Sequence, residues 1–232
     1  MPGLTHSVIW LICTLLEAGV VVCAFKSNSL RRYLFLNLYM GLSFLVSLGR
    51  FQVLDRWGQR SLEYAYFYFY SDALLTIGLY FALLNLYSLV FDEMKVEKYL
   101  RLGAVVLLGG TAWFSYAVIH ESSHRILSHF AFELSQNLYF VGLVLTYVLW
   151  GAILKLRETR TRLVQLVLAL GVYFSAFAAD YALRNLYTNS EGVWQYVTPV
   201  LGCVLPAAWA YSFLWVGEEA RLVPARLATV PR

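Results

Sequence analysis

The sequence predicts an all-α, multi-pass membrane protein, built as a bundle of seven transmembrane helices. Of its 232 residues, 60% are hydrophobic and only 14% are charged, whereas a soluble domain carries about a quarter charged residues. The apolar residues fall into seven runs that are joined by short polar connections. We therefore expect one transmembrane domain over 1–217 and a short cytoplasmic tail over 218–232.

Each predicted helix is an apolar run long enough to cross the hydrocarbon core of a bilayer, which is about 30 Å thick. The runs cover 6–25, 33–54, 62–91, 102–119, 126–154, 163–187 and 193–216. The first has no basic residue before it and no A-x-A cleavage site, so we expect a retained helix and no signal peptide. The third is the longest, and its excess length predicts a tilted helix. It opens with a run of aromatic residues.

The lysines and arginines predict the orientation. If the seven runs all cross, thirteen of the eighteen basic residues fall on one side and five on the other. Basic residues gather on the cytoplasmic side of a membrane. We therefore expect the N-terminus outside and the C-terminus in the cytoplasm, in a bacterial cytoplasmic (inner) membrane.

Polar side chains inside the runs form stripes at helical spacing, mostly in the outer half of the predicted bundle. Facing lipid, they would leave unsatisfied polar groups in hydrocarbon. The stripes therefore predict an outward-facing polar cavity. Its expected ligand-binding residues are Glu17, Arg50, Tyr68, Asp72, Thr76, Glu133, Gln136, Asn137, Asp180 and Arg184.

The charges of this predicted cavity do not balance. Four carboxylates face two arginines, and Asp180 and Arg184 lie one turn apart and are expected to pair. Arg50 can satisfy one of the remaining carboxylates. The others are then either protonated or matched by a cationic or hydrogen-bonding ligand. The alternative is that these polar groups only join helix to helix, as they do in many membrane bundles.

Histidines at the outer end of 126–154 offer a weaker metal site. His124, His129 and Glu133 approach one another if the helix is continuous, although their spacing matches no known zinc signature. The cofactor stays unknown. We expect no haem, because no histidine lies deep in a run, and no retinal Schiff base, because 193–216 contains no lysine.

Two further features concern packing and bending. Cys13, Cys23 and Cys203 all lie inside apolar runs without C-x-x-C spacing, so we interpret them as small packing residues with no disulfide. Pro199 and Pro206 each remove a backbone hydrogen bond, which predicts a kinked or locally unwound last helix.

Several function classes find no support. The chain has no G-x-S-x-G, H-E-x-x-H, phosphate-binding G-x-x-x-x-G-K-[ST] or dinucleotide motif. It also has no basic surface interleaved with aromatic residues, so we expect no nucleic-acid partner. The lipid bilayer is the expected partner, with a small-molecule ligand or a membrane protein complex as further candidates.

Three tracts carry a resemblance. The early Leu15-Leu16-Glu17, the basic Leu30-Arg31-Arg32 and the Tyr-rich start of 62–91 resemble those of a loose group of small seven-helix membrane proteins from bacteria of the acidobacterial kind. The resemblance covers the whole chain in layout. It implies the fold class and carries no activity.

The leading hypothesis is therefore a binding or sensing module that takes a small cationic or polar ligand, or a proton, in the polar cavity. One alternative is an accessory structural subunit of a larger membrane complex. Another is a transporter or a membrane-embedded metal-dependent hydrolase that uses His129 and Glu133.

Overall fold

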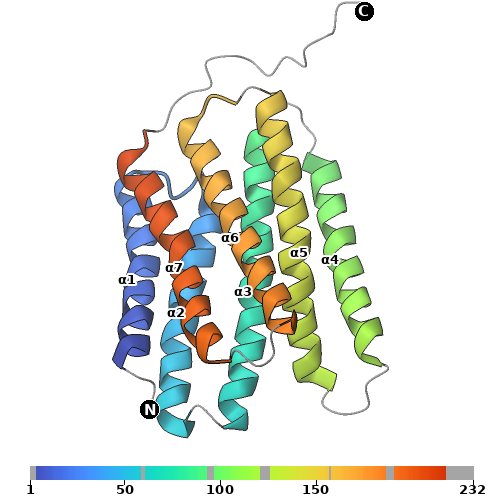
Figure 1. The fold of residues 1–232 in the computed structure, drawn as a ribbon. Coiled ribbons are helices and arrows are strands. Elements are labelled where there is room, and N and C mark those ends of the chain that lie inside the picture. Colours follow the sequence, from blue (N-terminus) through green and yellow to red (C-terminus); the bar gives the residue numbers. More distant parts are fainter. Residues whose placement is uncertain are drawn as a thin grey trace, which may run out of the picture.

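The computed structural model contains seven long α-helices (Figure 1). It describes residues 4–58, 61–92, 97–120, 126–156, 158–186 and 191–217. The helices are α1 Leu4–Lys26, α2 Leu34–Trp57, α3 Leu62–Val90, α4 Glu97–His120, α5 Ile126–Lys155, α6 Thr161–Leu186 and α7 Glu191–Trp215. The predicted seven helices are confirmed. Consecutive helices alternate in direction, so α1 begins and α7 ends at opposite ends of the bundle (Figure 1).

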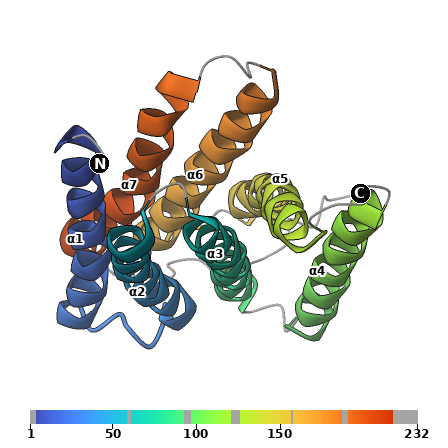
Figure 2. The same ribbon diagram turned by 90° about the horizontal axis from the view of Figure 1, so that it is seen from below.

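Six of the helices close into a ring. Each helix packs against the next in the order α1, α2, α3, α5, α6, α7, and α7 packs back against α1. Helix α4 is skipped in this order and lies outside the ring beside α5 (Figure 2). The first and last helices therefore become neighbours, and they run in the same direction.

The same six helices are the ones that could cross a membrane. Each has at least 18 residues and is apolar enough to cross a membrane by length and composition. In α4 the apolar part is shorter and covers Val105–Ala117. The seventh crossing, and the orientation of the bundle in a membrane, stay predictions.

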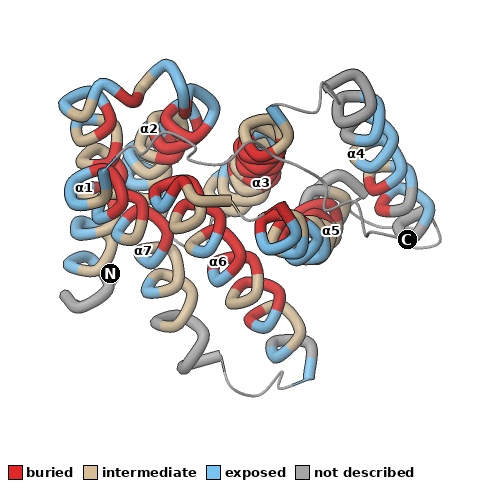
Figure 3. Tube along the Cα trace, turned by 90° about the horizontal axis from the view of Figure 1, so that it is seen from above, coloured by how far each residue is buried: buried red, intermediate tan, exposed pale blue. Residues whose placement is uncertain are grey.

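Helices α3 and α6 form the centre of the bundle, and they touch each other across the ring. Buried positions concentrate along them, whereas the described positions of α4 are mainly exposed (Figure 3). Large side chains fill the space between the helices, among them the fully buried Trp209, Tyr80 and Phe174. The exposed apolar side chains of the outer helices are those that a bilayer would cover.

Two glycines allow α5 and α6 to approach closely. A methyl group added to Gly142 would overlap the ring of Phe174, and one added to Gly171 would lie 2.8 Å from Trp150 and 2.9 Å from Thr146. Small residues at such crossings let two membrane helices pack backbone to backbone. Helix α7 stays helical through Pro199 and Pro206, so of the two predicted alternatives local unwinding is wrong, and a kink stays a prediction.

Two buried arginines tie helices together at the end where α7 finishes. Arg162 donates hydrogen bonds to the backbone oxygen of Val216 and to Ser29 Oγ, so it joins α6 to the end of α7 and to the turn after α1. Arg160 donates to both carboxylate oxygens of Glu158 and to the Leu89 carbonyl at the end of α3. Two of the basic residues that predict the inner side therefore also have structural roles.

Candidate functional site: a polar cluster between α1, α2 and α3

Glu17 is the most buried acidic group at the contact between α1 and α2. Its side chain is 8% exposed, and it accepts hydrogen bonds from Ser43 Oγ at 2.5 Å and Ser47 Oγ at 3.0 Å. The two serines lie one turn apart on α2, so both hydroxyls face the same carboxylate. Within the described residues Glu17 makes no ion pair. Its interaction with Arg50, further along α2, is electrostatic only.

Arg50 belongs to the same stripe of α2, and it joins that helix to α3. Its Nε donates to Ser71 Oγ at 2.9 Å, and its Nη2 lies 3.3 Å from the Tyr68 carbonyl and 3.8 Å from Asp72 Oδ1. The guanidinium also stacks over the Tyr68 ring, 4.3 Å from its centroid. The prediction that Arg50 satisfies one carboxylate is therefore realised at Asp72.

The Arg50 and Asp72 side chains are 21% and 20% exposed, so their ion pair lies at the edge of the buried region. Asp72 also receives a long hydrogen bond of 3.4 Å from the hydroxyl of Tyr181 on α6. We use the term polar cluster for Glu17, Ser43, Ser47, Arg50, Tyr68, Ser71 and Asp72. It brings three helices together and reaches a fourth through Tyr181.

Buried tyrosines continue the cluster toward the middle of the bundle. Tyr39, Tyr139 and Tyr173 come from α2, α5 and α6, and all three are at least nine-tenths buried. Their hydroxyls interact by hydrogen bonds in the order Tyr39, Tyr173, Tyr139, and Tyr139 also interacts with Thr76. Thr76 itself donates to the Asp72 carbonyl at 2.8 Å. These tyrosines therefore connect the four central helices through polar groups.

Sequence reasoning missed Tyr39, Tyr139, Tyr181 and Ser71. The tyrosines lie among apolar residues, where an aromatic ring reads as packing and its hydroxyl gives no separate signal. The available signal for Ser71 is its position directly before Asp72, which places its hydroxyl near the predicted partner of Arg50.

Asp180 lies apart from the polar cluster, at the contact between α6 and α7. It is 4% exposed and accepts a hydrogen bond of 3.1 Å from Thr198 Oγ1, one residue before Pro199. The side chain of Arg184 lies outside the described residues. The expected pair of Asp180 and Arg184 therefore stays a prediction.

The α5 stripe is not drawn into the polar cluster. Asn137 points to the outlying helix and donates to Ser115 Oγ of α4 at 3.0 Å. Glu133 and Gln136 are half-buried, and neither makes a hydrogen bond or ion pair with the cluster in the described part of the chain. Of the ten residues expected in one cavity, the structure brings together Glu17, Arg50, Tyr68, Asp72 and Thr76.

Most of the predicted metal site lies outside the residues that the structure describes. His124 is not among the described residues, and the side chain of His129 is not described either. Among the described residues no group of three histidines, cysteines or acids could hold a metal ion.

The cysteine interpretation is wrong for two of the three residues. Cys13 and Cys203, 190 positions apart, form a disulfide with their Cα atoms 4.9 Å apart, and Cys23 is free. The reason is the closed ring, which places α7 beside α1. Sequence spacing alone does not reveal which helix faces meet.

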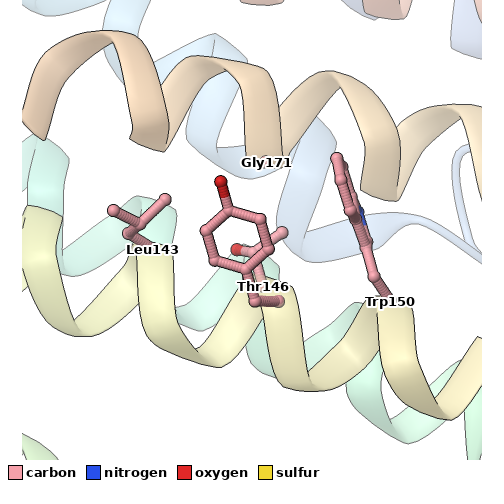
Figure 4. A pocket seen from close by; sticks show the side chains of 5 residues that line it. Leu143, Thr146, Trp150 and Gly171 are labelled. Carbon is pink, nitrogen blue, oxygen red and sulfur yellow. The ribbon is translucent and has the colours of Figure 1, made fainter. Parts of the chain in front are cut away.

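A recess between α5 and α6 holds none of the predicted site residues. It has no room for a water molecule, and it is lined by Leu143, Thr146, Tyr147, Trp150 and Gly171 (Figure 4). Two of its three polar side chains have partners, since Thr146 donates to the Gly142 carbonyl and Trp150 Nε1 to the Val167 carbonyl. It is therefore a packing gap beside the glycine contacts rather than a second polar site.

The bundle and its polar cluster define a class, a helical multi-pass membrane protein with buried charged groups. No family model, curated protein or solved structure matches the chain.

Proposed function

We propose that this protein is a membrane-embedded sensing module whose ligand is a proton, taken up at Glu17. The observation that carries the proposal is the setting of this carboxylate. It is buried, it faces two serine hydroxyls, and it has no ion-pair partner in the described part of the chain. Asp72 differs because Arg50 lies beside it.

The serine hydroxyls suit both protonation states of Glu17. An ionised carboxylate can accept from both hydroxyls, and the two hydrogen bonds to Glu17 fit that state. After protonation one carboxyl oxygen becomes a donor, and a serine hydroxyl can rotate to accept from it. The site can therefore gain or lose a proton without repacking the helices, and a proton needs no cavity.

The ion pair at the edge of the cluster offers water a way to approach. Arg50 and Asp72 are each about one-fifth exposed, and Arg50 interacts electrostatically with Glu17. If the predicted orientation holds, this edge faces the outer half of the membrane. A change of charge at Glu17 would alter the electrostatic interactions of Arg50. Because Arg50 joins α2 to α3, the contact between these two helices would change as well.

The test is a count of protons taken up by the purified full-length protein in lipid nanodiscs. An indicator dye reports uptake after a drop in pH in weakly buffered solution, for the native chain and for Glu17→Gln. We expect the variant to take up about one proton fewer. Glu133→Gln is the matched control, because Glu133 is half-buried and outside the polar cluster. Equal uptake by the native chain and Glu17→Gln would overturn the proposal.

A second candidate, the accessory subunit, has support from α4. This helix lies outside the ring, and its described side chains include the exposed Leu102, Val105, Val106 and Trp113. Such a helix is suited to contact with another membrane protein as well as with lipid. Native mass spectrometry after gentle extraction distinguishes the cases. Stoichiometric co-purified subunits favour the accessory role, and a bare monomer argues against it.

A further inference from the structure

The disulfide between Cys13 and Cys203 is the only covalent link between helices in the described chain, and it joins the first helix to the last. The proposed proton site does not use it. Both cysteines are half-buried, at the border between the interior of the bundle and its outer surface.

The neighbours of this disulfide face outward. On α1, Leu11, Ile12 and Leu15 are 50%, 49% and 63% exposed, and on α7 Val200 and Val204 are 50% and 36% exposed. These apolar side chains lie where a bilayer would cover them, near the middle of both helices. A molecule dissolved in the lipid can therefore approach the two sulfur atoms, whereas a charged aqueous reagent must cross apolar surface.

The link holds α7 close to Pro199, one of the two prolines inside this helix. Pro199 has no N–H to donate within the helix, and its carbonyl lies 3.4 Å from Cys13 Sγ. On the other side, Thr198 donates to Asp180 of α6. This segment of α7 therefore depends on contacts with both neighbouring helices, and the disulfide is the stronger of the two.

We infer that Cys13 and Cys203 form a redox modification site that cycles between a dithiol and a disulfide, with a lipid-soluble quinone as oxidant. The two thiols lose two electrons and two protons as the S–S bond forms, and the quinone gains both to become a hydroquinone. In the reverse step a dithiol reductant breaks the S–S bond, restores two S–H groups and itself becomes a disulfide. The oxidised state fixes α7 to α1, and the reduced state releases it.

The first experiment counts free thiols in the full-length protein in nanodiscs. The samples are denatured and alkylated, and the mass is then measured. We expect one labelled thiol, Cys23, in the oxidised protein and three after treatment with dithiothreitol. After the reductant is removed under argon, addition of decylubiquinone should return the count to one and produce one hydroquinone per protein. Three labelled thiols after quinone addition would overturn the inference.

The second experiment follows hydrogen exchange in α7. We expect amides near Pro199 to exchange at least tenfold faster in the reduced protein than in the oxidised one. The Cys23→Ala variant should respond like the native chain, because its disulfide is intact. The double variant Cys13→Ala, Cys203→Ala should exchange fast under both conditions. Equal exchange in the oxidised and reduced native protein would show that the link does not control α7.

Discussion

The hydroxyl of Ser43 on α2 donates a 2.5 Å hydrogen bond to Oε1 of Glu17 on α1, inside the bundle. Ser47 supports the same carboxylate from one turn away, at 3.0 Å. Replacing both serines by alanine leaves a buried acid without its two donors. We expect each of the two lost bonds to cost about 1.5 to 3 kcal/mol of stability when Glu17 is ionised, the range for a hydrogen bond to a charged group. Reversible unfolding in mixed micelles measures it, and an unchanged free energy would argue against these bonds.

The ion pair of Arg50 and Asp72 predicts a specific pattern in a double-mutant cycle. Arg50→Met removes the cation from Asp72 and the donor from Ser71, and we expect a loss of about 1 to 3 kcal/mol, less than for a fully buried pair because both side chains are one-fifth exposed. Asp72→Asn should cost less, since an amide oxygen can still accept from Tyr181. Losses that simply add in the double variant would contradict the pairing.

The hydrogen bonds of Arg162 predict that lysine at this position would stabilise the fold less than arginine does. Its guanidinium reaches the Val216 carbonyl with two nitrogens and Ser29 with a third, a fork that an ammonium group does not reproduce. We expect Arg162→Lys to lower the unfolding free energy by about 1 to 3 kcal/mol. The exposed Arg31→Lys is the matched control and should change it by less than about 0.5 kcal/mol. Equal effects would contradict the structural role of Arg162.

Close packing of α5 on α6 predicts that a single methyl group is harmful. In Gly142→Ala the new methyl would overlap the Phe174 ring, so we expect about 1 to 3 kcal/mol of destabilisation. Gly151→Ala on the same helix meets nothing within 4 Å and should be neutral or slightly stabilising. Thermal unfolding of the two variants side by side checks this. Similar melting temperatures would contradict the close approach of these helices.

The sequence predicted the helices well because apolar length and charge spacing are local properties. All seven runs became helices, and α3 begins at residue 62 as predicted, where Ser61 caps it by accepting from the Tyr64 N–H. The pairing of Arg50 with a carboxylate also followed from the count of charges. Helix length and capping are properties of a single helix, and the charge count is obtained by adding charged residues over the whole chain.

Helix order around the ring could not be predicted in this way. Because α4 is left outside, α5 takes its place beside α3, and Asn137 then faces α4 rather than the polar cluster. The same closure brings Cys13 to Cys203. Both results depend on which helix faces meet, a tertiary property for which a single sequence holds no direct signal. The expected single cavity therefore divided into a polar cluster, the Asp180 contact with Thr198, and the α4 contact.

The central claim is that Glu17 takes up a proton between two serine hydroxyls, and infrared difference spectroscopy tests it most directly. Spectra of the protein in nanodiscs, recorded between high and low pH, should show a carboxylic C=O band that is absent in Glu17→Gln and present in Glu133→Gln. In Ser43→Ala the band should move to higher frequency, because the carboxyl group has lost a hydrogen-bond partner. A spectrum of Glu17→Gln that keeps every band of the native protein would contradict the account.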